Sequence, residues 1–288
     1  MAQLDKTFPT LDCAACIMTP KMVDAGRHPN IKMLTYSEIK EISRTGKKFK
    51  VKVLRKPRYV DEKKCTGCGT CADNCPSEVP NEFDEKLGMR KAIYMPFPQA
   101  VPRAMTVDKD NCIECGLCEK VCGVKAVNHN QEPEEVELEV GAIIVATGYN
   151  LFDSRKKEEY GYGVYENVIT GLQLERILSA SGPTGGHVLR PSDGKIPKKV
   201  AFVQCVGSRD EKVGNQYCSR VCCMYATKEA ELVKEHVPGT ETIIFYMDIR
   251  AFGKGYEEFY RRAEKEFGIK YVKGRTAEII EDPATKNL

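Results

Sequence analysis

Eight of the fourteen cysteines in this chain fall into two copies of one pattern. Each copy reads C-x2-C-x2-C-x3-C, in the segments CTGCGTCADNCP and CIECGLCEKVCG. The short spacing lets successive thiolates converge on one small anionic object, and glycines within the loops permit the sharp backbone that this requires. The cysteines of the two copies are Cys65, Cys68, Cys71 and Cys75, and Cys112, Cys115, Cys118 and Cys122.

The doubled spacing is that of bacterial ferredoxins with two 4Fe-4S clusters, in which the fourth cysteine of each motif ligates the other cluster. Structural zinc is the alternative, but zinc sites usually pair C-x2-C units across about 12 to 20 residues. Iron-sulfur ligation is therefore the preferred interpretation. It predicts cluster 1 on Cys65, Cys68, Cys71 and Cys122, and cluster 2 on Cys112, Cys115, Cys118 and Cys75.

Four more cysteines lie in VQCVGSRDEKVGNQYCSRVCC, between a short apolar segment and a helical pattern. Strand, glycine turn and helix is the order in which a dinucleotide-binding fold presents its phosphate site. Here a helix N-terminus would instead favour thiolates and an anionic cluster. Their spacing matches no ferredoxin loop and no usual zinc site, so buried structural cysteines are the alternative. The four are Cys205, Cys218, Cys222 and Cys223.

The remaining candidates are weaker. Cys13 and Cys16 form a C-x2-C pair, a spacing used by redox dithiols and by metal half-sites, although a packed pair is equally compatible with it. His28 and His187 have no partner at ligand spacing, which favours surface or capping roles.

The motifs need elements to position them. The segment EIKEISRTGKKFKVKVLRKP predicts a hairpin, and VELEVGAIIVATGYN predicts a strand that enters a buried sheet and stops at Thr147-Gly148. The ferredoxin-type module lies between these two pieces and is therefore expected to be an insertion. We expect a strand in KVAFVQ, a helix in MYATKEAELVKE, and an amphipathic helix in GYEEFYRRAEKEFG that stops at Gly268.

The composition of the chain limits its possible binding partners and its cellular location. With 44 basic and 41 acidic side chains the net charge is +3, so no global field points to nucleic acid or to an anionic membrane. The N-terminus shows no export signal, and the longest apolar run is far short of the roughly 20 residues of a membrane span. We therefore expect a cytoplasmic protein whose cysteines bind metal rather than form disulfides.

Four segments together resemble one family: MAQLDKTFPTLDCAACIMTPKMVDAGRHPNI, the doubled ferredoxin motif, VQCVGSRD with YCSRVCC, and YMDIRAFGKGYEEFYRRAEKEFGIKYVKGRTAEI. The family is the A-subunit of heterodisulfide reductase, an iron-sulfur flavoprotein of methanogens and other anaerobes. The resemblance implies an α/β, thioredoxin-reductase-like flavoprotein fold, present in part. Its expected domains are residues 1–57 and 131–155 of an FAD-type domain, an inserted α+β two-cluster ferredoxin domain over 58–130, and a pyridine-nucleotide-like α/β domain over 156–288.

The resemblance also implies an activity. It makes the chain an oxidoreductase subunit that relays electrons between a flavin and 4Fe-4S clusters, with flavin-based bifurcation in the intact family. A third 4Fe-4S cluster would be held by Cys205, Cys218, Cys222 and Cys223, and FAD would lie beside Ala146, Thr147 and Gly148. Expected partners are the other reductase subunits, an electron-donating hydrogenase or dehydrogenase, and ferredoxin.

The sequence departs from the family in one respect. No G-x-G-x-x-G fingerprint is present, because Ala72, Glu166 and Glu258 occupy the third glycine position of the three G-x-G starts. We therefore expect a fragment, or one piece of a split subunit, that binds FAD weakly and no nicotinamide by itself. The alternatives are a ferredoxin-like electron carrier without flavin, and an oxidoreductase resembling the small subunit of glutamate synthase, which Cys205 and Gly207 in the second dinucleotide turn disfavour.

Overall fold

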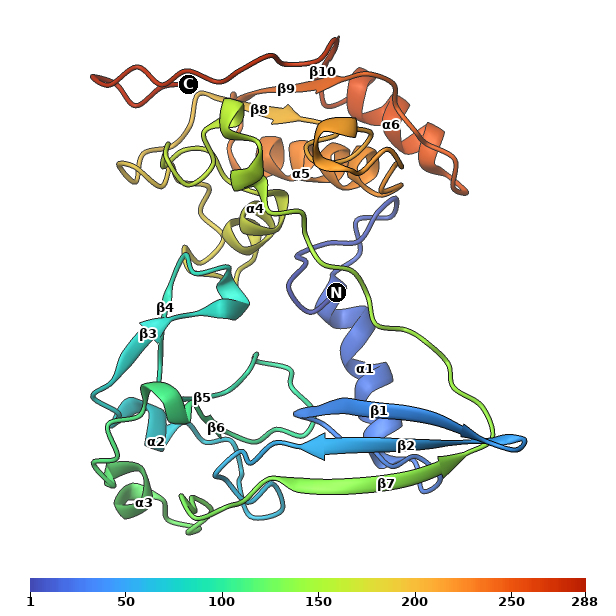
Figure 1. Ribbon diagram of the computed structural model, residues 1–288. Coiled ribbons are helices and arrows are strands. Elements are labelled where there is room, and N and C mark those ends of the chain that lie inside the picture. Colours follow the sequence, from blue (N-terminus) through green and yellow to red (C-terminus); the bar gives the residue numbers. More distant parts are fainter. The chain divides into compact units, whose positions relative to one another are not determined.

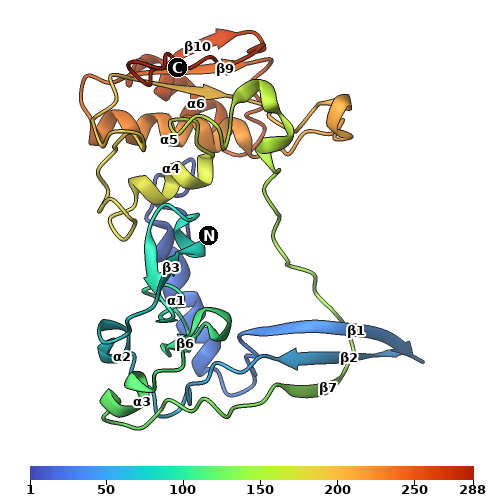
Figure 2. The same ribbon diagram turned by 60° about the vertical axis from the view of Figure 1, so that its left-hand side comes forward.

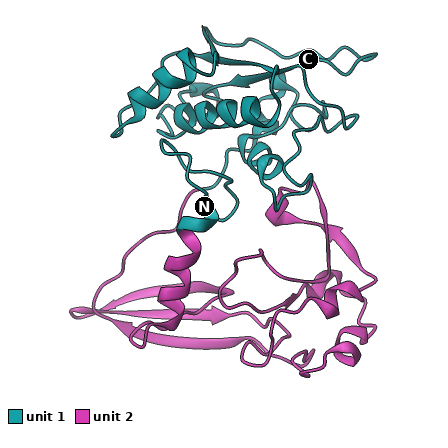
Figure 3. Cartoon of the chain, turned by 180° about the vertical axis from the view of Figure 1, so that it is seen from behind, with its two compact units in different colours: residues 1–17, 150–288 teal, residues 18–149 magenta.

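The computed structural model describes residues 1–288, and these divide into two compact units. One unit comprises residues 1–17 and 150–288, and the other comprises residues 18–149 (Figure 3). Helix α1 (Ala14–Arg27) contributes its first turn to one unit and the rest to the other. The domain boundaries expected at residues 57, 130 and 155 stay predictions, since the structure groups the cysteine-rich module with the sheet that precedes and follows it.

That sheet has three antiparallel strands in the order β1-β2-β7 (Figure 1). Strands β1 (Ser37–Thr45) and β2 (Lys48–Arg55) form the predicted hairpin, and Gly46 turns with a φ of 62°. β7 (Glu134–Val140) returns to pair with β2. Alternation in β2 buries Val51 and Val53 and leaves lysines on the other face, where Lys50 Nζ lies 2.9 Å from Glu137. Residues 56–133, between β2 and β7, form the cysteine-rich module.

The module is built from short elements. It contains helices α2 (Thr70–Asp73) and α3 (Leu117–Val121) and the 3-10 turns η1 (Glu82–Asp84) and η2 (Lys109–Asn111). Its strands form two antiparallel pairs. Strand β3 (Glu78–Pro80) pairs with β4 (Met89–Lys91), and β5 (Ile93–Tyr94) pairs with β6 (Thr106–Val107). The buried core includes two thiols; its members are Val60, Cys71, Ile93, Met105, Val107, Cys118 and Ala126.

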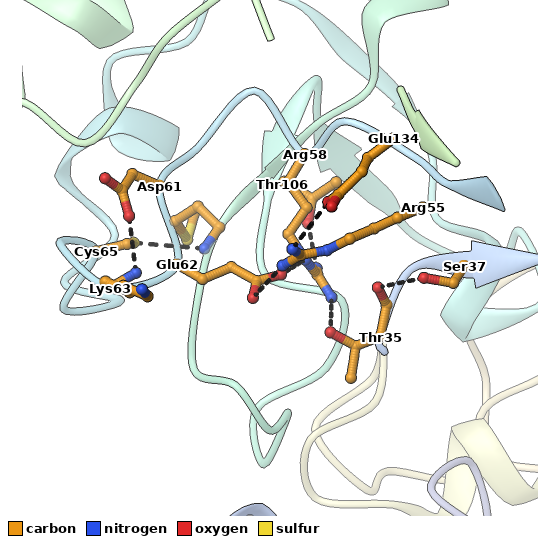
Figure 4. A network of polar contacts seen from close by, with 11 residues as sticks. Thr35, Ser37, Arg55, Arg58, Asp61, Glu62, Lys63, Cys65, Thr106 and Glu134 are labelled. Atoms are coloured by element: carbon orange, nitrogen blue, oxygen red, sulfur yellow. Dashed lines mark hydrogen bonds and ion pairs between the residues drawn. The ribbon is translucent and has the colours of Figure 1, made fainter. Parts of the chain in front are cut away.

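A polar network around Arg58 joins the sheet to this module (Figure 4). The buried Arg58 guanidinium donates to Glu62 at 2.7 Å, to Thr106 at 2.8 Å and to Thr35 at 2.9 Å. Arg55 of β2 also donates to Glu62, at 3.0 Å. Because the Arg58 guanidinium has an acceptor at each of its three nitrogens, the buried cation is well satisfied and fixes the loop that leads to the first motif.

The other unit contains a parallel sheet in the order β10-β9-β8, formed by β8 (Lys199–Val203), β9 (Glu241–Tyr246) and β10 (Lys270–Lys273) (Figure 2). Helices α5 (Cys222–His236) and α6 (Tyr256–Lys265) connect successive strands, and α4 (Gly171–Leu178) packs on α5. Three 3-10 turns lie in the loops: η3 (Ser154–Lys156), η4 (Glu158–Tyr160) and η5 (Glu211–Val213). The predicted strand and both predicted helices are confirmed.

This βαβαβ arrangement makes the chain mixed α/β, as expected. Gly268, with a φ of 63°, follows the last helix as predicted. The finer assignment to a thioredoxin-reductase-like fold stays a prediction. No helix of the structure combines the length and the apolar character needed to cross a membrane.

The strand predicted to run to Thr147-Gly148 is shorter in the structure than expected. β7 ends at Val140, and residues 141–149 have neither strand nor helix. Their apolar side chains are exposed rather than buried, with Ile144 at 93% and Val145 at 78% exposure. The physical reason is that no strand of this chain pairs with the segment, and an apolar run becomes a buried strand only where neighbours satisfy its backbone.

Candidate iron-sulfur sites

Both ferredoxin-type motifs turn into a short helix at a glycine in the left-handed region. Gly69 (φ 88°) precedes α2 and Gly116 (φ 70°) precedes α3. Glycine adopts this conformation at no steric cost, so each loop can reverse sharply and carry its third cysteine inward. Those third cysteines, Cys71 and Cys118, are the two buried thiols of the module.

The second predicted set of ligands lines one small cavity. Its wall contains all three leading cysteines of the second motif and, from the first motif, the fourth cysteine. The members are Cys75, Cys112, Cys115 and Cys118, and Ile93, Val107 and His129 lie among the other lining residues. The fold therefore carries Cys75 across to the other motif, which is the exchange expected of a two-cluster ferredoxin.

The first predicted set is gathered around the same core. Cys71 is close enough to Cys65 and Cys68 for their charges to act on it, and Cys122 packs against the shared core. Backbone amides point at the sulfurs, as they do around protein-bound clusters. Cys65 Sγ accepts from Gly67 N at 3.4 Å and from Met105 N at 3.5 Å.

Burial sets the protonation of the inner thiols. It raises the pKa of Cys71 to about 11, helped by the neighbouring sulfurs of Cys65 and Cys68, and it also raises the pKa of Cys118. The exposed Cys68 differs, because the Thr70 hydroxyl holds its pKa below the usual range. Metal must therefore displace protons from the inner thiols, so assembly is favoured as pH rises.

Nowhere in the chain do three or more His, Cys, Asp or Glu side chains converge closely enough for a single metal ion. A 4Fe-4S cluster takes each thiolate at a separate iron, and four thiols around one cavity fit that requirement.

The third set of cysteines is assembled by the parallel sheet. Cys205 follows β8, and Cys222 and Cys223 open α5. Burial raises the pKa of Cys205, Cys222 and Cys223, and each of these thiols also feels the charge of at least one other member, Cys218 included. The four thiols are therefore neighbours in space, although twelve residues separate Cys205 from Cys218 in sequence.

Two further features, a strained backbone and nearby arginines, distinguish this third group. Cys205 has a φ of 61°, a strained conformation for a non-glycine residue, and such strain is typical of functional sites. Burial raises the pKa of Cys205 and the nearby Arg209 guanidinium partly opposes this effect, while Arg250 lies beside Cys218. Both arginines also contact Asp248, at 2.6 and 3.2 Å, which holds them in place around the thiols.

The other candidates are placed as follows. Cys16 N donates to Cys13 Sγ at 3.2 Å in the first turn of α1, and the Cys16 thiol lowers the pKa of Cys13 by hydrogen bonding to it. The redox role of this pair stays a prediction. His28 and His187 are exposed, and His28 Nδ1 accepts from Asn30 N within a turn at 3.2 Å.

The residues expected beside FAD are Ala146, Thr147 and Gly148. All three lie in the exposed segment that follows β7. Flavin binding therefore stays a prediction that the family resemblance alone carries.

Sequence reasoning missed two features. Lys228 of α5 and Glu175 of α4 form a fully buried ion pair, and Lys228 Nζ also donates to the Lys6 carbonyl at 3.0 Å. Burial raises the pKa of the adjacent Glu229 carboxyl well above its usual range. The second feature is His129, whose Nε2 is 3.3 Å from Cys118 Sγ. Neither the charges in the helical pattern nor an isolated histidine signalled these contacts.

Comparison with known proteins agrees with this geometry. A family model for the 4Fe-4S dicluster domain matches residues 64–127. With the doubled motif and the shared cavity, this defines an iron-sulfur protein that contains a two-cluster ferredoxin-type domain.

Proteins similar over nearly the whole chain are A-subunits of several heterodisulfide reductases. The chain is 62% identical over 283 residues to the A-subunit of the H2:CoB-CoM heterodisulfide,ferredoxin reductase of Methanothermobacter marburgensis, covering 98% of this chain and 43% of that protein. It is 62% identical to the iron-sulfur A-subunit of the CoB--CoM heterodisulfide reductase of Methanocaldococcus jannaschii, covering 100% of this chain and 44% of that protein. It is 52% identical to the A-subunit of the ferredoxin:CoB-CoM heterodisulfide reductase of Methanosarcina mazei, covering 97% and 35%.

The chain is therefore homologous throughout to the A-subunit of heterodisulfide reductase, which confirms the resemblance. It spans less than half the length of these curated relatives.

Proposed function

We propose that this chain is the electron-relaying part of a heterodisulfide-reductase-type A-subunit, and that it holds three 4Fe-4S clusters. When bound, such clusters accept and donate single electrons. The observation that carries the proposal is the cavity lined by Cys75 and by Cys112, Cys115 and Cys118, because thiols from both motifs meet there.

Each of the three cysteine sets would hold one cluster. Cys65, Cys68, Cys71 and Cys122 would hold the first cluster, and Cys112, Cys115, Cys118 and Cys75 the second. Cys205, Cys218, Cys222 and Cys223 would hold a third. The closeness of these four thiols and the flanking arginines supports this third site.

The relatives' names support a proposal about the partners of this chain. Other components of the same reductase, a hydrogen- or formate-linked electron donor and ferredoxin are the partners that we propose. A second candidate function is a ferredoxin-like carrier without flavin. The similarity of nearly the whole chain to reductase A-subunits supports the electron relay over this carrier.

The test is anaerobic reconstitution of the chain with iron and sulfide. Three clusters predict about 12 iron and about 12 acid-labile sulfide per chain, against about 8 of each for the ferredoxin-type module alone. Cys68→Ser should remove one reducible cluster and leave the module partly assembled. Protein that takes up zinc but neither iron nor sulfide would contradict the proposal.

Flavin separates the two candidate functions. Reconstitution with FAD, followed by desalting, should leave bound flavin if the chain forms part of a flavin relay by itself. Retention of none, with full iron content, favours the carrier. Rapid reduction of the clusters by NADH or NADPH without added protein would contradict both.

A further inference from the structure

His129 lies just beyond the residues matched by the dicluster family model, yet it contacts a predicted cluster ligand. Its Nε2 is 3.3 Å from Cys118 Sγ, and the ring lines the cavity of the second cysteine set. The ring also stacks on Tyr59, with centroids 6.4 Å apart and planes inclined by 27°. Stacking and the cavity wall together fix the direction in which Nε2 points.

The environment of Nδ1, the second ring nitrogen of His129, indicates which nitrogen carries the hydrogen. His129 Nδ1 is buried and has no hydrogen-bond partner. A cysteine that ligates metal loses its proton, so Cys118 sulfur can then only accept. Nε2 must carry the hydrogen to bond it, which leaves Nδ1 as an unpaired acceptor. A buried unpaired acceptor is tolerated better than a buried unpaired N–H donor.

The two cysteine sets differ in their backbone donors. Thiols of the first set accept from three backbone amides: Gly67 N and Met105 N to Cys65, and Ala126 N to Cys122, the last at 3.2 Å. The second set accepts from Glu114 N, which donates to Cys112 at 3.4 Å. His129 adds a side-chain donor to the set that has fewer amide donors.

Hydrogen bonds to ligand sulfur stabilise the reduced state, because reduction adds negative charge to the cluster. They therefore raise the reduction potential. Donors to charged acceptors are also the stronger ones. Without the imidazole, the second set would have the weaker donor complement, and an added electron would favour the first.

We propose that His129 sets the reduction potential of the cluster held by Cys75, Cys112, Cys115 and Cys118, raising it toward that of the first cluster. This inference rests on the proposed function. Comparable potentials keep electron transfer between the two clusters nearly balanced, so electrons can cross the module in either direction. His129 does not ligate the cluster. It acts as a positioning residue through its hydrogen bond to the Cys118 sulfur.

His129→Phe tests the idea most directly, because it keeps an aromatic ring against Tyr59 and removes the N–H donor. In the reconstituted full chain, redox titration followed by EPR should show one cluster whose reduction equilibrium constant is about tenfold less favourable. That corresponds to a potential lower by about 59 mV for one electron. Iron content should not change, and Cys115→Ser and Cys68→Ser identify which signal belongs to which cluster.

A spectroscopic signature should accompany the shift. With ¹⁵N-labelled histidine, the reduced wild-type chain should show a nitrogen coupling to the second cluster that His129→Phe lacks. The control is His28→Phe, an exposed position in the same unit, which should alter neither the coupling nor the potential.

Several outcomes would overturn the inference. An unchanged potential in a fully loaded His129→Phe chain would do so, as would an equal shift of both clusters. If His129→Phe loses iron, the pair His129→Gln and His129→Met separates the roles: the amide should restore the potential and the thioether should not, and equal potentials count against the idea. Loss of the second cluster in all three variants would make His129 an assembly residue and overturn its role in setting the potential. A wild-type chain without iron would reject the proposed function as well.

Discussion

The chain gathers thiols in two different ways. In the module of residues 56–133, each loop supplies three cysteines within seven residues, and a glycine-capped helix of four or five residues turns the third inward. In the other unit, Cys205 and the cysteines of α5 meet only because a parallel sheet brings the end of β8 to the start of a helix.

The difference predicts which region depends on iron. The module has strands of two or three residues and a core that includes Cys71 and Cys118, so little apolar burial stabilises it. The second region has a 15-residue helix, α5, packed on a sheet and on α6. In the module the metal would supply folding free energy, whereas in the second region the fold would exist before the metal binds.

Removal of iron should therefore have the largest effect, because it should unfold the module and leave the second region folded. After chelation under anaerobic conditions, amide hydrogen exchange should accelerate throughout residues 58–130, because short helices are not stable by themselves. Protection in β8, β9 and α5 should persist. Equal loss of protection in both regions would contradict this contrast.

The second test removes the third set alone. Cys222→Ser with Cys223→Ser should lower iron from about 12 to about 8 per chain and leave the EPR signals of the two ferredoxin-type clusters unchanged. The matched control, Cys13→Ser with Cys16→Ser, should keep about 12. A double variant at α5 with full iron and an unchanged spectrum after reduction would mean that these thiols bind no cluster.

A third test asks whether the polar network around Arg58 stabilises the module against the sheet. Arg58→Met should destabilise the unit of residues 18–149 by about 2 to 3 kcal/mol, because it leaves Thr106 and part of Glu62 without their donor. Urea unfolding of the iron-loaded chain measures the effect. The control is Arg44→Met, at an exposed strand position, and an equal effect there would refute the role of the network.

The smallest expected effect concerns pH and the second region. Burial raises the pKa of Glu231 to about 7, although Arg262 lies 3.2 Å away. The folded state then holds a proton that the unfolded state has released, so stability falls as pH rises from about 4.5 to about 7 and is level above that. Glu231→Gln should flatten this slope.

At pH 8 the same change should stabilise the unit by about 1 to 3 kcal/mol, since one pKa unit corresponds to about 1.4 kcal/mol. Unfolding of the wild-type and variant chains across pH 4 to 8 measures the difference. Glu235→Gln, at an exposed position of the same helix, is the control. Parallel pH profiles for the wild type and Glu231→Gln would contradict the assignment.

The sequence by itself determined the two-cluster motif, the hairpin, the α/β character and the helices that follow β8 and β9. These follow from local rules: cysteine spacing, alternation in a strand, and apolar periodicity in a helix. The same rules failed at residues 141–149, where an apolar run predicted a buried strand. Local sequence cannot report whether a partner strand is present, and that decides burial.

Tertiary structure alone decided which distant groups meet. Cys75 lies 37 residues before Cys112, yet both line one cavity, and His129 reaches Cys118 from beyond the second motif. Lys228 and Glu175, from α5 and α4, pair in the interior although each falls in an ordinary helical pattern. Such contacts depend on how whole elements pack, because the path of the chain sets the distance between residues that are far apart in sequence.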